Sequence, residues 1–295
     1  MGKIILIGGK VDKGTPLSSQ EKSELQSIKG IKMVKLEILE RLINELKGSD
    51  SRLEIITSAS KTPYAIGNEY KKAFKKLKCK NIGVIHCKSS QEADLPENIE
   101  RLMKCDGVLF TGGDQNLLCD VFLKTKFLKN LKERFKREKD FLVAGTSAGA
   151  MALTKEMISL EKSGNPFLKG RITITKGFNL LPRIIIDTHF IQRRRLSRLI
   201  EAVATYPYKL GIGLAENTAV FFKTSDKVEV IGINLVILID GSHISYNNIK
   251  QIKKNQNICL QDVKLHILPK GQMFNIIKRK ILKNKAKKSN GGAGN

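Results

Sequence analysis

The segment Phe141-Leu-Val-Ala-Gly145-Thr-Ser147-Ala-Gly149 decides both the fold and the candidate chemistry of this chain. Its apolar start, 141–144, runs directly into the pattern G-x-S-x-G, and the small residues 148–153 continue as a helix. A serine on so sharp a strand-to-helix turn needs small neighbours, and its hydroxyl projects at the carboxyl edge of the sheet. The segment therefore predicts a nucleophile elbow at Ser147, with the Ala148 N–H free at the helix start to bind an oxyanion. The same residues also fit a turn that only lets a helix pack close to a strand.

Short apolar runs alternate with helix-like periodicity on the N-terminal side of this turn. Such runs, bounded by polar residues, are typical of buried parallel strands connected by helices. The strands expected there are Lys3–Ile7, Leu53–Thr57, Ile82–His86, Gly107–Phe110 and Phe141–Ala144. Beyond Thr154 we expect one helix, Ile191–Thr205, and further strands at Arg171–Thr175, Ile184–Asp187, Thr218–Phe222, Val228–Ile231, Leu235–Ile239 and Lys264–Leu268.

These patterns predict an α/β fold, a three-layer sandwich with a mainly parallel sheet and extra β-strands in the C-terminal half. The sequence has no internal repeat and no Pro/Gly-rich linker, so we expect residues 1–277 to form a single domain. Seven of the eleven residues from Lys278 to Lys288 are basic. We expect residues 278–295 to form a basic, disordered tail.

Composition excludes several classes of protein. The 295 residues are 41% hydrophobic and 27% charged, which is typical of a globular chain. No apolar run reaches the roughly 18 to 20 residues of a membrane-spanning helix. Because the first strand begins at Lys3, we expect no signal peptide. The five cysteines are scattered without a zinc-binding pattern. We therefore expect no membrane partner, no metal, no other cofactor and a location in the reducing cytoplasm.

The net charge of +25 could indicate a nucleic-acid partner. The excess is spread over the whole chain, however, and much of it lies at helix-surface spacing or among acidic residues. The chain also has no tryptophan and only 6% aromatic residues for base stacking. These observations favour a solvated surface and disfavour a nucleic-acid partner.

A second glycine-rich loop, Thr111-Gly-Gly-Asp-Gln115, follows the expected strand Gly107–Phe110 and precedes a helix. Its glycines allow backbone N–H groups to approach a ligand closely, which makes Gly113 the natural second oxyanion donor. An ordinary glycine turn is the alternative. Gly8-Gly9, after the first strand, lacks the spacing of a dinucleotide fingerprint and receives little weight.

An activated serine needs a base and a group that orients the base. Of the four histidines, His189 ends an expected strand just ahead of an arginine-rich segment, and we expect it to be the base. Glu216 lies among small residues between apolar stretches, where an unpaired carboxylate is costly. Glu216 is therefore the expected orienting acid, with Asp187 as the competitor.

The expected helix after His189 begins with three consecutive arginines. Its apolar face comprises Leu196, Leu199, Ile200 and Val203, with Arg194, Arg198 and Glu201 projecting away and Arg193 and Arg195 flanking it. Guanidinium groups beside a serine nucleophile suit a substrate with carboxylates, which arginine binds bidentately. A solvated basic helix is the alternative.

Four sequence blocks resemble one family, the cyanophycinases and their relatives, which are serine peptidases with a class I glutamine amidotransferase-like fold. The blocks lie in family order: Phe110-Thr-Gly-Gly-Asp-Gln115, Gly145-Thr-Ser-Ala-Gly-Ala150, Asp187-Thr-His-Phe190 with Arg193, Arg195 and Arg198, and Leu210-Gly-Ile-Gly-Leu-Ala-Glu216-Asn-Thr-Ala219. The resemblance implies that Ser147 is the nucleophile, His189 the base and Glu216 its partner. It implies an oxyanion hole at Gly113 and Ala148, and a substrate cleft lined by Gln115, Asp187, Arg193, Arg195 and Arg198.

One position departs from the family pattern, because Thr188 stands where such enzymes usually carry glutamine before the histidine. This departure leaves Ser147, His189 and Glu216 in place, but the resemblance no longer fixes the exact substrate. The first hypothesis is an exopeptidase that releases β-Asp-Arg dipeptides from cyanophycin, a poly-aspartate with arginine on each side chain. The alternatives are a peptidase for small acidic or isoaspartyl peptides and a non-catalytic basic protein that binds nucleic acid or another anionic polymer. The sequence does not decide whether the protein forms a homodimer.

Overall fold

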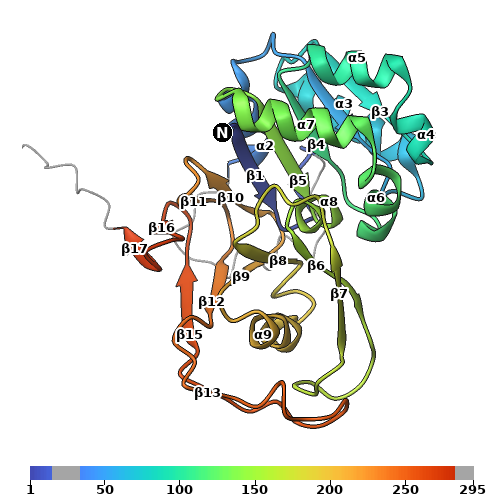
Figure 1. Ribbon diagram of the computed structural model, residues 1–295. Coiled ribbons are helices and arrows are strands. Elements are labelled where there is room, and N and C mark those ends of the chain that lie inside the picture. Colours follow the sequence, from blue (N-terminus) through green and yellow to red (C-terminus); the bar gives the residue numbers. More distant parts are fainter. Residues whose placement is uncertain (15–33, 283–295) are drawn as a thin grey trace, which may run out of the picture.

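A nine-stranded sheet forms the centre of the computed structural model, which describes residues 1–14 and 34–282 (Figure 1). Its strand order is β17-β16-β11-β10-β1-β5-β4-β2-β3. The parallel half comprises β1 (Lys3–Ile7), β5 (Leu142–Thr146), β4 (Gly107–Phe110), β2 (Leu53–Ile56) and β3 (Ile82–Ile85). The antiparallel half comprises β10 (Thr218–Phe222), β11 (Lys227–Gly232), β16 (Met273–Asn275) and β17 (Lys280–Leu282). The predicted α/β class is confirmed.

Helices cover both faces of the parallel half, as the continuous apolar runs of its strands require. On β1, Ile5 and Ile7 face α2 (Glu37–Leu46) and α3 (Pro63–Lys76), whereas Ile4 and Leu6 belong to the core on the opposite face. That opposite core contains residues of α5 (Pro96–Lys104), α6 (Gln115–Phe122), α7 (Lys126–Arg137) and α8 (Ala148–Ala152). A short helix, α4 (Ser90–Ala93), precedes α5.

A second, four-stranded sheet lies beside α9 (Leu196–Thr205), in the lower part of Figure 1. Its order is β15-β12-β9-β8, with β8 (Ile184–Thr188) parallel to β9 (Leu210–Leu214) and with β12 (Val236–Asp240) and β15 (Lys264–Leu268) antiparallel. Two hairpins complete the chain, β6 (Glu156–Glu161) with β7 (Ile172–Lys176), and β13 (Tyr246–Asn247) with β14 (Leu260–Gln261). The sequence did not lead us to expect the strands β6, β9, β13, β14, β16 and β17.

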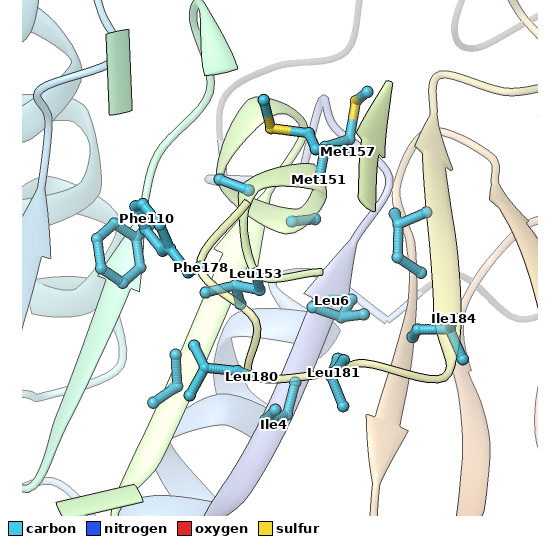
Figure 2. Packing of buried hydrophobic residues seen from close by; sticks show 14 of the residues in the cluster. Ile4, Leu6, Phe110, Met151, Leu153, Met157, Phe178, Leu180, Leu181 and Ile184 are labelled. Carbon is cyan, nitrogen blue, oxygen red and sulfur yellow. The ribbon is translucent and has the colours of Figure 1, made fainter. Parts of the chain in front are cut away.

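Buried residues join the second sheet to the first behind the elbow. Figure 2 shows Met151 of α8, and Leu153 directly after α8, near Leu6 of β1. Met157 of β6 and Ile184 of β8 lie close by. Each of these side chains is at most 2% exposed. Burying a side chain of this size contributes about 1.5–3 kcal/mol, so this contiguous cluster holds the ends of β5 and β8 in a defined relation.

Two sequence expectations change at the ends of elements. The helix expected from Ile191 begins only at Leu196, because Arg194 has a left-handed φ of 51° and residues 190–195 form turns. The sheet also extends past the domain end expected at 277, since β17 pairs Lys280–Leu282 with β16. The rest of the expected tail, 283–295, lies outside the described residues.

Candidate active site

Ser147 occupies a strained turn between β5 and α8. Its φ of 51° and ψ of −116° place a non-glycine residue in a conformation that usually costs about 1–3 kcal/mol. The turn is stabilised because the Ser147 N–H donates to Ile7 O of β1 at 2.9 Å. A Cβ at Gly149 would lie 2.2 Å from Phe110 O, so only glycine allows α8 to approach β4 this closely. These features are those of the nucleophile elbow predicted from the sequence.

His189 reaches the elbow from the end of β8. Its φ is 51°, and its N–H donates to Gly8 O at 2.8 Å, so the backbone after β8 is attached to the end of β1. The imidazole packs over Gly9, where a Cβ would lie only 2.4 Å from the ring. Ser147 Oγ and His189 Nε2 are 2.9 Å apart, which is within hydrogen-bond distance. The structure thus brings the two residues together across 42 positions of sequence.

Glu216 approaches the other side of the imidazole. It follows β9, and because β8 and β9 are parallel neighbours with Thr188 opposite Leu214, their carboxyl ends meet at one edge. His189 Nδ1 and Glu216 Oε1 are 2.6 Å apart. The carboxylate also pairs with Lys10 Nζ at 3.3 Å. The carboxylate beside His189 is therefore that of Glu216 and not that of Asp187.

Burial lowers the pKa of His189 below its ordinary value of 6.5, with Arg193 and Arg195 acting in the same direction. The hydrogen bond and negative charge of Glu216 oppose this shift without reversing it. The side chain is thus neutral near pH 7, with Nε2 able to accept the Ser147 proton while Nδ1–H donates to Glu216.

This pKa direction predicts the pH dependence of catalysis. Because only neutral His189 accepts a proton, we expect the acidic limb of the kcat/KM profile to lie below pH 6.5. Arg193→Met removes a positive charge that lowers this pKa, so the limb should move to higher pH. Arg194→Met, on an exposed neighbour, should leave the limb in place. If the acidic limb lies at the same pH in Arg193→Met as in the parent protein, the assignment of His189 as the base would be contradicted.

The two candidate oxyanion donors lie on either side of Ser147. Ala148 N–H opens α8, and the loop carrying Gly112 and Gly113 follows β4, the strand next to β5. A Cβ at Gly112 would lie 3.3 Å from Ser147 Cβ, so this loop passes directly beside the hydroxyl. Within residues 1–14 and 34–282, the N–H groups of Gly113 and Ala148 have no hydrogen-bond acceptor, and both remain free for a ligand oxygen.

Asp187 is placed differently from the sequence expectation. Its side chain is fully buried, and it accepts two 2.6 Å hydrogen bonds from Arg198 Nε and Nη2. Arg195 Nη1 adds contacts of 3.3 Å to Asp187 Oδ1 and 2.8 Å to Thr188 O. The Asp187 carboxylate is therefore held by Arg195 and Arg198, and Arg198 also pairs with Glu161 Oε2 at 3.2 Å.

Arg198 and Glu201 were expected on the exposed side of the helix, and this expectation is wrong. Each is only 5% exposed, whereas Leu196 is 40% exposed. The β6–β7 hairpin covers this side of α9, and Glu201 accepts hydrogen bonds from the N–H groups of Gly170 and Ile172. Burial raises the pKa of Glu201, which these N–H groups partly offset.

Arg198→Met should destabilise the protein strongly. It leaves the buried Asp187 carboxylate without its bidentate partner, and breaking a buried ion pair by removing one member costs about 3–5 kcal/mol. Urea unfolding of Arg198→Met and of Arg194→Met, which changes an exposed arginine, measures the difference. We expect Asp187→Leu combined with Arg198→Met to recover part of the loss. Equal stability of Arg198→Met and the parent protein would contradict the account of this cluster.

Of the other residues expected in the substrate cleft, Arg193 is exposed, whereas the side chains of Gln115 and Thr188 contact other parts of the protein. Arg193 is exposed close to His189, and the Arg193 N–H donates to His189 O at 2.9 Å. Gln115 Nε2 donates to Ser159 O at 2.8 Å, which ties α6 to β6. Thr188 is 1% exposed and its hydroxyl lies 3.4 Å from Met151 Sδ, so this side chain points into the core.

Lys10 and Gln192 were not singled out from the sequence, and Gly8-Gly9 was given little weight there. Gly8 and Gly9 support His189, Lys10 pairs with Glu216, and Gln192 Oε1 accepts the Glu216 N–H at 3.1 Å. A topological signal was available for the glycines, because they end β1, the strand adjacent to β5. Over the described part of the chain, no group of three or more His, Cys, Asp or Glu side chains could hold a metal ion.

Comparisons with known proteins point to one family. The model of peptidase family S51 matches residues 27–231. A cyanophycinase from Geminocystis herdmanii is 32% identical over 239 residues, which are 81% of this chain and 88% of the relative. A cyanophycinase from Trichormus variabilis is 31% identical over 246 residues, which are 83% of this chain and 82% of the relative.

A solved structure supports the fold. The crystal structure of a peptidase from an acI-B1 Actinobacterium superposes with a TM-score of 0.58 at 18% identity, covering 93% of this chain and 96% of that one. At this identity the likeness concerns the fold alone, and it agrees with the α/β arrangement that the sequence predicted. Sequence and family matches together cover most of the chain, and the chain therefore belongs to peptidase family S51 and is a serine-type peptidase.

Proposed function

We propose that this peptidase is a cyanophycinase-like exopeptidase, which hydrolyses cyanophycin to β-Asp-Arg dipeptides. The observation that carries the proposal is the hydrogen-bonded series Ser147 Oγ, His189 Nε2 and Nδ1, and Glu216 Oε1, with distances of 2.9 and 2.6 Å. This is the arrangement of nucleophile, base and orienting acid that acyl transfer requires. Two relatives at 31–32% identity are named cyanophycinases, which supports this substrate.

In the proposed mechanism, Ser147 Oγ attacks the scissile carbonyl while His189 Nε2 takes the hydroxyl proton. The resulting oxyanion accepts hydrogen bonds from the N–H groups of Gly113 and Ala148. Collapse of the tetrahedral intermediate breaks the C–N bond, and His189 gives its proton to the leaving amine. Water, deprotonated by His189, then hydrolyses the ester on Ser147, and the proton returns to the serine.

The substrate is tested by incubating the purified protein with insoluble cyanophycin and following soluble products by mass spectrometry. We expect the mass of β-Asp-Arg to accumulate with the parent protein and not with Ser147→Ala. Release of longer fragments or of free arginine by the parent protein would contradict the exopeptidase assignment.

One observation favours a second candidate, a peptidase for small acidic or isoaspartyl peptides. The Asp187 carboxylate, expected to meet a substrate guanidinium, is fully buried and paired with Arg198. Arg193 remains exposed beside the base and suits a substrate carboxylate. Parallel assays with isoaspartyl and Asp-X dipeptides decide between the candidates, because only the second predicts faster turnover of these peptides than of cyanophycin.

The location, the domain count and the oligomeric state stay predictions. No helix among the described residues is long and apolar enough to cross a membrane, and all five cysteines are unpaired. We keep a cytoplasmic location, a single domain and the open homodimer as expectations from the sequence, together with the absence of a nucleic-acid partner.

A further inference from the structure

A cavity of about 660 Å³ opens at the carboxyl edge of the parallel sheet. Its walls are formed by residues after β2, residues after β3 and the outer face of α6. This volume lies within the range of small-ligand sites, about 300–1,000 Å³. The residues that matter to its chemistry are Ser60, Lys61, Tyr64, His86, Lys88 and Leu117.

The cavity adjoins the loop that carries the proposed oxyanion donor. Its wall includes Ser58 and Ser60, and the residue between them, Ala59, accepts the Asp114 N–H at 2.9 Å. The same loop touches the Ser147 side chain at Gly112. A Cβ at Gly113 would lie 2.9 Å from Ser60 N, so the loop beside Ser147 packs directly against the wall of this cavity.

The ionised side chains in the cavity wall are all cationic. Lys61 and Lys88 are exposed, and neither ammonium group has an ion-pair partner within the described ranges. Burial and the charge of Lys88 lower the pKa of His86, so its ring is a neutral hydrogen-bonding group. No acidic residue lines the cavity. Acidic side chains, Glu92 and Glu97, belong to the adjoining cavity, which also contains Lys71 and Arg101.

The walls also offer apolar surface next to these charges. Tyr64 is 76% exposed and Leu117 is 41% exposed, and both line the cavity, so they offer apolar surface to a ligand there. A carboxylate on a short carbon chain complements such a site, because the ammonium groups bind its oxygens while the tyrosine ring and leucine side chain pack against its stem.

We propose that this cavity is a substrate subsite that binds a carboxylate next to the scissile peptide, with Lys61 and Lys88 as its charged contacts. The inference rests on the proposed function and names the recognition chemistry of the same site. Arginine joined through its α-amino group to the aspartate side chain keeps its α-carboxylate, so every unit of cyanophycin presents this group. Small acidic peptides present it as well.

Calorimetric titration tests the proposal in a Ser147→Ala background, where turnover does not interfere. The probe is a three-unit β-Asp-Arg oligomer, and its control is the same oligomer with the arginine carboxylates converted to amides. We expect Lys61→Met with Lys88→Met to weaken binding of the acid about tenfold, and the amide to bind weakly to every protein. Lys129→Met, an exposed lysine on α7, is the matched control and should bind like the background protein.

Charge-preserving variants separate recognition from folding. Lys61→Arg with Lys88→Arg should retain the affinity for the acid, and urea unfolding should give the same stability for both double variants. Equal affinity of the methionine double variant and the control, or equal binding of acid and amide, would overturn the proposal. The titration measures binding without turnover, so it tests the subsite even if the parent protein hydrolyses no cyanophycin. Absence of hydrolysis by the parent protein would count against the proposed function and not against the subsite.

Discussion

Ser147→Ala should lower peptide hydrolysis by roughly 10⁵- to 10⁶-fold, because it removes the only group that bonds covalently to the substrate. The substitution deletes one oxygen from a half-buried side chain and leaves the backbone hydrogen bond to Ile7 O in place. The free energy of unfolding should therefore change little. Alanine tolerates the positive φ of this turn no better than serine, so the strain is common to both proteins.

The measurement is product release from cyanophycin and from isoaspartyl peptides, with the parent protein, Ser147→Ala and Ser90→Ala compared at equal concentration. Ser90 lies on the short helix α4 and lines neither the elbow nor the oxyanion loop. We expect Ser90→Ala to keep full activity. Turnover by purified Ser147→Ala at the parent rate would rule out the acyl-enzyme mechanism.

Glu216→Gln should lower kcat by roughly three to four orders of magnitude. The carboxylate accepts the His189 Nδ1–H at 2.6 Å and stabilises the imidazolium that forms during proton transfer. A glutamine amide has nearly the same shape, but it carries no charge and its nitrogen favours the wrong tautomer of the ring. Because Glu216 faces the imidazole and not the substrate, we expect KM to change much less than kcat.

The control for this variant is Glu138→Gln, which removes a carboxylate that pairs with Arg134 at the end of α7. It should leave kcat and KM unchanged. Steady-state kinetics on one soluble peptide compare the three proteins. A Glu216→Gln protein with parent kcat would show that another group orients the base.

The parallel strands and the elbow were predictable because local pattern and tertiary position agree at these residues. The expected bounds of Lys3–Ile7, Gly107–Phe110, Thr218–Phe222 and Lys264–Leu268 match the observed strands. The elbow followed from a strand, a small-residue turn and a helix in direct succession. His189 and Glu216 follow parallel neighbours of the four-stranded sheet, whose carboxyl ends meet at one edge. Ser147 follows β5 of the nine-stranded sheet, so its contact with His189 depends on how the two sheets pack.

The environment of the arginines could not be predicted, because it depends on contacts distant along the chain. Helical periodicity places Arg198 and Glu201 opposite the apolar stripe, which is the exposed side of an ordinary amphipathic helix. Here Asp187 of β8 and the turn before β7 supply polar partners on that side, so both charges are buried. The role of Gly9 could not be predicted for the same reason, because His189, which packs over it, lies 180 positions away in the sequence.

The central claim is that His189 activates Ser147 as a nucleophile, and covalent labelling tests it most directly. A fluorophosphonate reacts with activated serine hydroxyls, and intact-mass and peptide mass spectrometry locate the adduct. We expect one adduct on the parent protein, at Ser147, no adduct on Ser147→Ala, and much slower labelling of His189→Ala. An adduct at another residue, or equal labelling rates for the parent and His189→Ala proteins, would contradict the claim.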